Sequence, residues 1–314
     1  MRVYTNFDEL GEIKNPVLTI GTFDGVHVGH QKIIERIKSE AEKTGGETVL
    51  FTFFPHPRLV LNPADNSLRM IQTLEEKKAN LERLGLDHLI IFPFTKEFAN
   101  VAAEDFIRDF LVDKLHVKTI VVGYDHQFGR NRQGNLKFLQ QYSKEFGYKV
   151  IELPAEEIDE VNVSSTKIRQ AILSGDIETA NAYLNESFSL TGKVVKGRQL
   201  GRTIGCPTAN IEVSDPLKII PAIGIYAVNV LLDNGEMYHG MMSIGKNPTV
   251  TDDQSIKLEV NLFDFEGDLY GRTITVHFLK YLRNELKFDS LDELIKQLDE
   301  DRKASMDYFS ALDV

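Results

Sequence analysis

Short strand-like runs alternate with longer stretches of helical periodicity in the first half of the chain, and this alternation constrains the fold more than any other feature. The stretches with the spacing of amphipathic helices cover residues 30–43, 74–85, 103–115 and 135–147. Strands separated by helices of this length are typical of a parallel sheet with helices on both faces, so we predict a doubly wound α/β domain. The predicted strands are VLTI (17–20), TVLFTF (48–53), HLIIFP (88–93), TIVVG (119–123) and KVIEL (149–153).

The second half of the chain has a different pattern, in which short β-rich runs are separated by Gly, Asn and Asp turns. LDNGE at 232–236 is a strong hairpin signal between two such runs. Several short antiparallel strands predict a small barrel or sandwich. A long amphipathic helix, capped by Ser290, is predicted at 290–312. We place a boundary near residues 183–188 and predict two domains of different class, 1–185 and 186–314.

Size, charge and cysteine content limit the classes of protein that fit this chain. Its 314 residues suffice for two cores, and Cys206, the single cysteine, excludes an internal disulfide and a cysteine-rich zinc site. A net charge of −11 disfavours a nucleic-acid partner, because such proteins usually present a basic face. No apolar run approaches the roughly 18 residues of a membrane span, and the N-terminus has no continuous hydrophobic region. We therefore expect a cytoplasmic protein with no membrane partner.

GTFDGVHVGH, at residues 21–30, follows the first predicted strand directly and combines three glycines with two histidines. Ligands of parallel sheets bind beyond the carboxyl ends of the strands, where this segment and GYDHQFG (123–129) both fall. A helix that begins at about His30 would present free N–H groups to a phosphate, and His27 and His30 could donate hydrogen bonds to it. A tight turn with satisfied imidazoles and a metal site are the two alternatives. Gly21, Gly25 and Gly29 would let the main chain approach the ligand closely.

A second candidate anion site lies in VNVSSTKIRQ at 161–170. Ser164 or Ser165 can cap a helix whose first turn carries Thr166, Lys167 and Arg169. Hydroxyl groups and cations at a helix N-terminus suit a phosphate, although a plain cap on a solvated helix is the alternative.

The second half contains its own candidate ligands in PTAN (207–210) and in the strand around Glu259. Pro207 restricts the backbone so that the Thr208 hydroxyl and the Asn210 amide can face one ligand. Oxygen groups of this kind suit Mg²⁺ bound to nucleotide phosphates, whereas the simpler alternative is a turn that enters a strand. Glu259 alternates with apolar neighbours and is a candidate base, or else a solvated strand residue.

GTFDGVHVGH together with SSTKIR (164–169) resembles the nucleotidyltransferase superfamily, in which a histidine loop binds the triphosphate. FFPHP (53–57) and GYDHQFGRNRQG (123–134) narrow the resemblance to the adenylyltransferase module of bifunctional bacterial riboflavin kinase/FAD synthetases. It implies that His27 and His30 stabilise the α- and β-phosphates in the transition state. The further implied contacts are Gly21, Phe23, Asp24 and Gly29 with ATP, Ser164, Thr166 and Arg169 with the pyrophosphate end, and Asp125 and Phe128 with the flavin. The chain departs from the family pattern on the flavin side, at Phe54 and at His126 and Gln127.

The second half resembles the riboflavin kinase module of the same enzymes, whose fold is a six-stranded Greek-key barrel with a C-terminal helix. The resemblance rests on GRTIGCPTAN, SIGKNPT, the pattern E-x-x-x-x-D-F-x-x-D-L-Y-G from Glu259, and YLRNELKF (281–288). It implies that Thr208 and Asn210 bind Mg²⁺ with ATP, beside Gly201, and that Glu259 is the general base. Arg283 would lie on the flavin side. Cys206 stands where the family usually has Phe.

The two resemblances together cover residues from about 15 to 312 and imply two sequential reactions. The C-terminal domain would phosphorylate riboflavin to FMN, and the N-terminal domain would adenylylate FMN to FAD, with Mg²⁺–ATP in both and no tightly bound prosthetic group. A different nucleotidyltransferase, such as a class I aminoacyl-tRNA synthetase, is one alternative, although the K-M-S-K-S-like element is absent. A flavin-sensing module without catalysis is another. The sequence carries no indication of the oligomeric state.

Overall fold

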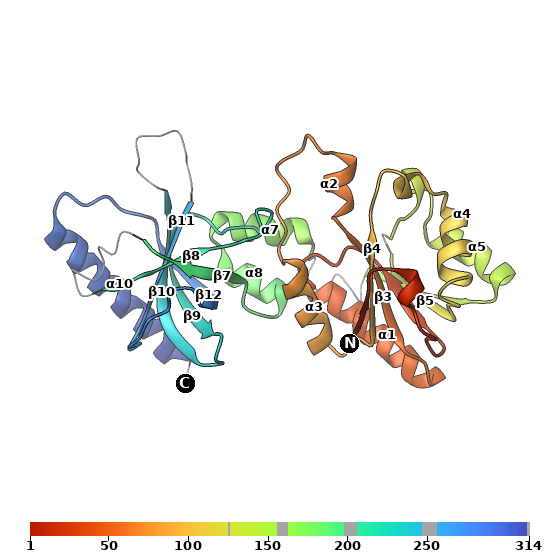
Figure 1. Ribbon diagram of the computed structural model, residues 1–314, viewed down its shortest axis with the longest axis horizontal. Helices are drawn as coiled ribbons and strands as arrows, with labels where there is room; N and C mark the ends of the chain where they lie inside the picture. The colour runs from red at the N-terminus through yellow and green to blue at the C-terminus, as the bar shows by residue number, and fades with distance from the viewer. Residues whose placement is uncertain (125, 156–162, 198–205, 247–255, 313–314) are drawn as a thin grey trace. The chain divides into compact units, whose positions relative to one another are not determined.

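The computed structural model describes residues 1–124, 126–155, 163–197, 206–246 and 256–312. The chain divides into two compact units, Met1–Ser165 and Thr166–Val314 (Figure 1). This division falls twenty residues before the predicted boundary at 185/186, because the helices α7 (Ser165–Ser174) and α8 (Ile177–Leu184) group with the second unit. Asn181 of α8 donates a hydrogen bond to the carbonyl of Phe278 at 2.8 Å, which ties this helix to the barrel.

The first unit is built on a six-stranded parallel sheet in the order β1-β4-β3-β2-β5-β6, and the predicted doubly wound fold is confirmed. The five predicted strands are β2 to β6, while β1, with only three residues, was not predicted. The strands are β1 (Arg2–Tyr4), β2 (Val17–Ile20), β3 (Thr48–Phe54), β4 (His88–Pro93), β5 (Thr119–Gly123) and β6 (Lys149–Leu153). The helices are α1 (Val28–Thr44), α2 (Pro57–Leu61), α3 (Leu74–Arg83), α4 (Ala103–Asp105) and α5 (Leu136–Phe146), with the short helices η1 (Phe7–Glu9), η2 (Phe98–Asn100) and η4 (Arg130–Arg132).

The region 103–115 was predicted as one α-helix, and this prediction is wrong for most of its length. After α4 the chain continues as a π-helix, η3 (Phe106–Val112), in which the hydrogen-bonded turns are wider. The ring of Phe106 stacks on that of Phe110, with centroids 5.7 Å apart. Periodicity alone does not distinguish a π-helix from an α-helix over two turns.

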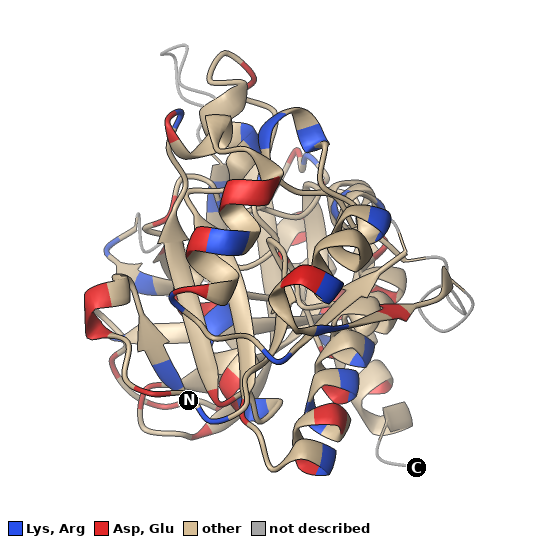
Figure 2. Ribbon diagram, turned by 90° about the vertical axis from the view of Figure 1, so that its right-hand side faces the viewer, with Lys and Arg blue, Asp and Glu red and all other residues tan. Residues whose placement is uncertain are grey.

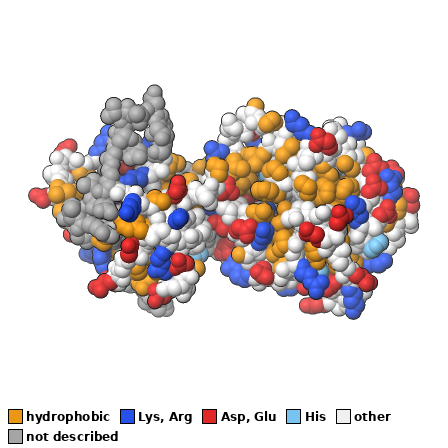
Figure 3. All heavy atoms as spheres, in the orientation of Figure 1, with side chains coloured by type: hydrophobic (Ala, Val, Ile, Leu, Met, Phe, Trp, Pro, Cys, Tyr) orange, Lys and Arg blue, Asp and Glu red, His pale blue; other side chains and the backbone are white. Residues whose placement is uncertain are grey.

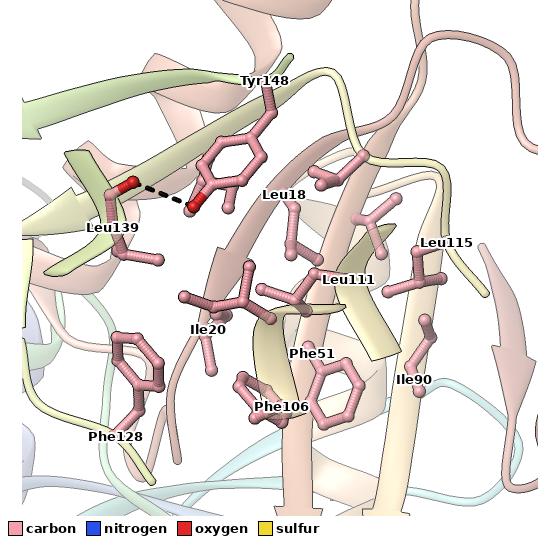
Figure 4. Close-up of a cluster of buried hydrophobic side chains, with 14 of the residues drawn as sticks. Leu18, Ile20, Phe51, Ile90, Phe106, Leu111, Leu115, Phe128, Leu139 and Tyr148 are labelled. Atoms are coloured by element: carbon pink, nitrogen blue, oxygen red, sulfur yellow. Dashed lines mark hydrogen bonds between the residues drawn. The ribbon is translucent and has the colours of Figure 1, made fainter. Parts of the chain in front are cut away.

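The sheet separates two hydrophobic cores, because neighbouring residues of a strand point to opposite faces. Leu18 and Phe51 pack with side chains of η3 and α5 in one core, which Figure 4 shows. Val17 and Leu50 pack with side chains of α1 and α3 in the other. In the first core the Tyr148 hydroxyl donates a hydrogen bond to the Leu139 carbonyl at 2.9 Å.

The second unit contains a closed barrel in the strand order β10-β11-β8-β7-β12-β9. Strands β9, β10 and β11 follow one another as hairpins and β12 returns beside β9, which is a Greek key, as predicted. The C-terminal helix α10 (Leu291–Leu312) is also confirmed. The strands are β7 (Ser189–Val195), β8 (Ala209–Glu212), β9 (Gly224–Leu232), β10 (Met237–Lys246), β11 (Ile256–Leu262) and β12 (Thr273–Arg283).

The surface carries mixed charge and some exposed apolar side chains. Figure 2 shows Lys and Arg interspersed with Asp and Glu along the ribbon. Among the described residues, no helix is both long and apolar enough to cross a membrane. Figure 3 shows hydrophobic side chains gathered on the face of the first unit that this view presents. Phe54, at the end of β3, is 52% exposed, and Tyr124, directly after β5, is 45% exposed.

Two candidate active sites

The histidine loop, residues 21–27, leaves the sheet at the point where the strand order reverses. Strand β2 lies between β3 and β5, and the chain builds outward from it first through β3 and β4 and later through β5 and β6. Loops that follow the two central strands of such a sheet diverge and leave a crevice at the carboxyl edge, where ligands bind. The histidine loop follows β2, and the segment that begins at Tyr124 follows β5. The structure therefore brings the two predicted loop motifs to one edge.

The backbone of the histidine loop is unusually bent. Phe23 and Val26 have φ values of 47° and 36°, in the left-handed region that a β-branched residue such as Val26 rarely adopts. Gly25, at φ 90°, tolerates this region, and a Cβ there would lie 3.0 Å from Ile71. Backbone strain of this kind is found where the surrounding structure holds a functional loop in place.

Helix α1 begins at Val28, two residues before the predicted start, and His27 occupies its N-cap without a side-chain capping bond. The first N–H groups of an α-helix have no carbonyl partner within the helix and, with the helix dipole, favour an anion. Gly29 is buried in this first turn. The start of α1 therefore presents free N–H groups and the positive end of a helix dipole, and its binding of phosphate stays a prediction.

The two histidines lie in a stack of three rings. The His27 and His30 centroids are 3.7 Å apart with an interplanar angle of 19°, and the Phe23 ring stacks on His30 at 4.3 Å. The Nδ1 atoms of both histidines are buried and have no hydrogen-bond partner among the described residues. Such atoms are rare in folded proteins, and a ligand that approaches the rings would provide the missing partners.

Burial keeps both imidazoles neutral at pH 7. It lowers the pKa of His27 from 6.5 to about 4, even though the nearby Asp24 carboxylate favours the protonated form. Burial likewise lowers the pKa of His30 well below its ordinary value, and the proximity of His27 and of Lys77 acts in the same direction. A neutral imidazole has one N–H donor and one acceptor nitrogen, so each ring can donate one hydrogen bond to a phosphate oxygen.

Asp24 holds the loop to segments that are distant in the sequence. Its carboxylate accepts hydrogen bonds from the Ile71 N–H at 3.1 Å and from the Gln72 N–H at 3.4 Å. The Ser165 hydroxyl donates to the Asp24 carbonyl at 2.9 Å. The Asp24 residue is 1% exposed, so these contacts position the loop. The sequence motifs did not identify Ser165 as a site residue beyond a possible cap, and its role here depends on a long-range contact.

Lys77 is the residue of this site that the sequence analysis missed. It lies in α3, is 6% exposed, and donates a hydrogen bond from Nζ to the Thr22 carbonyl at 2.7 Å. Its charge interacts with Asp24 and with His30. In the sequence, Lys77 and Lys78 are adjacent lysines of a polar helix, and nothing in that pattern distinguishes the buried lysine from the exposed one.

The other predicted residues of this site have varied surroundings. A Cβ at Gly21 would lie 2.9 Å from the Phe23 ring, which explains the glycine. Ser164 directly precedes α7, while Thr166 and Arg169 belong to α7 within the second unit. Phe128 is 8% exposed and packs in the core of Figure 4, so its flavin contact stays a prediction. Asp125 lies outside the described residues, and Gln127 is exposed.

The second candidate site lies between β8 and β11 of the barrel. Strand register places Glu259 directly opposite Asn210, and the Thr208 hydroxyl lies 3.4 Å from the Glu259 carboxylate. The Asn261 amide donates to the Pro207 carbonyl at 2.7 Å and so holds the PTAN turn in place. The three predicted residues Thr208, Asn210 and Glu259 are therefore adjacent.

Close backbone packing and a pocket complete this site. A Cβ at Gly197 would lie 2.1 Å from the Asn210 amide nitrogen, so a larger residue there would displace this side chain. A pocket beside the turn is lined by Pro207, Thr208 and Ala209 and by a segment from Phe265 to Tyr270. Lys257 forms an ion pair with Glu259 at 2.8 Å.

The oxygen groups of Thr208, Asn210 and Glu259 are the donor type that Mg²⁺ prefers. Within the described ranges no group of three His, Cys, Asp or Glu side chains could hold a metal ion by itself. Gly201 lies outside the described residues.

The guanidinium of Arg283 contacts a side chain of α10 and the adjacent main chain. It makes two hydrogen bonds to the Asp301 carboxylate of α10, at 2.7 Å and 2.6 Å, and a third to the Asn284 carbonyl. The Asp301 side chain is 4% exposed. Arg283 therefore joins the end of β12 to α10, and its predicted place on the flavin side stays a prediction.

Comparison with known proteins identifies the class of both units. The family model for FAD synthetase matches residues 11–167, and the model for riboflavin kinase matches residues 184–309. His27 and His30 lie within the FAD synthetase match. The cluster of Thr208, Asn210 and Glu259 lies within the riboflavin kinase match. The fold and the sites thus define a protein with a nucleotidyltransferase domain followed by a kinase domain.

Curated relatives combine the two domains in one chain. A bifunctional riboflavin kinase/FMN adenylyltransferase from Listeria monocytogenes is 37% identical over 98% of this chain and 96% of its own length. Proteins of the same description from Haemophilus influenzae and Escherichia coli K12 are 37% and 38% identical, over 94% and 93% of this chain and 94% and 92% of their own lengths. The chain belongs to the family of bifunctional riboflavin kinase/FMN adenylyltransferases.

A solved structure shares the fold over nearly the whole chain. It comes from Streptococcus pneumoniae, is described as a macrolide-efflux protein, and is 36% identical with a TM-score of 0.88. The match covers 97% of this chain and 98% of the other. The family assignment rests on the family models and the curated relatives, which name flavin-nucleotide enzymes.

Proposed function

We propose that the first unit joins FMN to the adenylyl group of ATP and that the histidine loop is its reaction centre. The observation that carries the proposal is the stacked pair His27 and His30 at the start of α1, with two buried Nδ1 atoms that have no partner among the described residues. A phosphate at this helix end would meet backbone N–H groups and imidazole donors together. The exposed rings of Phe54 and Tyr124 offer apolar surface at the same strand edge for a flat aromatic ligand.

In the proposed reaction an oxygen of the FMN phosphate attacks the α-phosphorus of ATP. A new P–O bond forms there, and the bond to the bridging oxygen breaks, so that FAD and pyrophosphate are the products. The attacking phosphate is already anionic at neutral pH, and no protein nucleophile is required. His27 and His30 donate hydrogen bonds to oxygens whose negative charge increases as pyrophosphate departs, and such preorganised donors accelerate this type of reaction. Thr166 and Arg169 are proposed to bind the pyrophosphate end.

We propose that the second unit phosphorylates riboflavin, with the PTAN turn as its nucleotide site. The oxygens of Thr208 and Asn210 would hold Mg²⁺ that arrives with ATP, and this ion would neutralise charge on the phosphate oxygens. Glu259 accepts the proton of the riboflavin 5′-hydroxyl as its oxygen attacks the γ-phosphorus, and ADP leaves. The position of Glu259 opposite Asn210 supports this assignment, because the base and the nucleotide ligand then face one site. ATP, riboflavin, FMN and FAD are the proposed small-molecule partners, in the cytoplasm.

Two variants test the division of labour within the full chain. His30→Ala should abolish FAD formation from FMN and leave riboflavin phosphorylation intact. Asn210→Ala should abolish riboflavin phosphorylation and leave FAD formation from supplied FMN intact. Both products are resolved by chromatography, and circular dichroism confirms that the variants are folded. A folded variant of either kind that lost both activities would contradict the assignment of one reaction to each unit.

A further inference from the structure

Lys77 occupies a position that is unfavourable for a cation in two respects. Its side chain is buried, and removing an ammonium group from water is costly. It also lies in the first turns of α3, close to the helix N-terminus, where the helix dipole disfavours positive charge. Thr73 and Glu76 already form a capping box at this helix start, so capping does not require Lys77. A lysine side chain that is buried at such a position is a candidate for a functional role.

The contacts of Lys77 direct its charge toward the histidine loop. Nζ donates a hydrogen bond to the Thr22 carbonyl at 2.7 Å, directly behind the loop that carries His27 and His30. Burial lowers the pKa of Lys77, and the Asp24 carboxylate opposes that effect. Asp24 in turn accepts hydrogen bonds from the main chain at Ile71 and Gln72, which precede α3.

Lys77 and Asp24 place one basic and one acidic side chain beside the histidine loop. Both histidines are neutral at pH 7 because burial lowers their pKa values, so they contribute hydrogen bonds without net charge. Glu76 turns toward the Thr73 N–H at the helix cap. Lys78 pairs with Glu75 on the exposed side of the helix at 2.8 Å. Within the described part of the chain, Lys77 and Asp24 are buried and both contact the loop, and the oxygens of Asp24 are held by main-chain hydrogen bonds.

We propose that Lys77 is a positioning residue that holds the histidine loop through Thr22 and supplies a buried positive charge for binding the triphosphate of ATP. This inference rests on the proposed adenylyl transfer and adds to it the source of the charge. Lys77 acts from behind the loop. The positive charge proposed for Lys77 lies in a partly desolvated region. Solvent and salt should therefore screen its field less than they screen the field of a surface lysine. Lys77 should therefore strengthen the binding of a negatively charged ligand and have little effect on the binding of an uncharged ligand.

The test compares inhibitors of different charge in the full chain, with FMN and Mg²⁺–ATP as substrates and FAD formation as the readout. Inorganic tripolyphosphate carries the charge of the triphosphate, and adenosine carries none. Lys77→Met should raise the inhibition constant of tripolyphosphate by about tenfold and change that of adenosine by less than about twofold. Lys77→Arg should keep the tripolyphosphate value within about threefold of wild type, because the charge is retained. Lys78→Met is the matched control from the exposed face and should resemble wild type.

A purely structural role would produce a different result. If Lys77→Met weakened both inhibitors alike, or left tripolyphosphate binding within about twofold, the inference would be overturned. Should Lys77→Met fail to fold, Lys77→Gln, which retains a hydrogen-bond donor without the charge, replaces it in the same comparison. Calorimetric titration of tripolyphosphate needs no turnover. If Lys77→Met weakened the binding of tripolyphosphate but the wild-type chain made no FAD, this inference would stand and the proposed function would be contradicted.

Discussion

The burial of His27 predicts a specific loss of stability in mild acid. Its pKa is about 4 in the folded chain and 6.5 when exposed, so the unfolded chain binds a proton on this residue more readily. Stability that His27 contributes as a neutral ring is present above pH 6.5 and is lost as the pH falls toward 4. Between pH 7 and pH 5 this linkage amounts to about 2 kcal/mol in the unfolding free energy.

The variant His27→Asn removes the titratable ring and keeps a polar side chain at the N-cap of α1. We expect its loss of stability between pH 7 and pH 5 to be smaller than that of wild type by about 2 kcal/mol. Hydrogen exchange read by mass spectrometry on peptides of β2 and α1 measures the opening free energy of this region, without requiring both units to unfold together. His116→Asn is the control, because His116 is exposed and its φ of 50° suits Asn. Equal pH dependence in wild type and His27→Asn would refute the desolvation argument.

Three further predictions concern particular contacts. A Cβ at residue 197 would lie 2.1 Å from the Asn210 amide, so Gly197→Ala should lower the kcat of riboflavin phosphorylation by about a hundredfold. FAD formation from FMN should be unchanged in a coupled assay. Glu40, which is bonded to Lys43 and Lys149 and has a pKa of about 2, stabilises the fold above pH 4.5, and that stability is lost as the pH falls toward 2. In urea titrations Glu40→Gln should therefore cost about 1 kcal/mol at pH 7 and progressively less below pH 4.5. Arg283→Ala should destabilise the second unit by about 3 kcal/mol in thermal unfolding, because it removes the guanidinium that pairs with the buried Asp301 carboxylate and leaves that carboxylate the hydrogen bond from Gln297. Lys296→Ala, from an exposed pair on the same helix, should change stability by less than about 0.5 kcal/mol.

The fold could be predicted where the local signal was strong. The runs that became β2 to β6 are rich in β-branched and aromatic residues and are followed by turns or helices, so their type and order were confirmed. β1 was missed because RVY is too short to show alternation. The π-helical turns of η3 depend on how Phe106 and Phe110 pack, which local periodicity does not report.

The residue types of both sites could be predicted, but not their environment. The glycines and the helix start beside His27 and His30 indicated a phosphate loop, whereas the stacking and depressed pKa values of the histidines come from burial by the folded chain. Lys77 meets Thr22 across 55 residues, and Asp24 meets Ile71 across 47. No local pattern encodes contacts at such separations.

The second site shows the same limit. From their own motifs, Thr208 and Asn210 were plausible Mg²⁺ ligands and Glu259 was a candidate base. The register of β8 against β11 brought them together, and register is a property of the closed barrel.

The central claim is that one chain converts riboflavin to FMN and FMN to FAD in two separate units. The most direct measurement incubates the purified chain with riboflavin and Mg²⁺–ATP and follows the flavins and nucleotides by chromatography over time. We predict that FMN and ADP appear first, and that FAD and pyrophosphate follow as FMN is consumed. Riboflavin that binds to the chain but is recovered unchanged would contradict the claim and favour a flavin-binding module without catalysis.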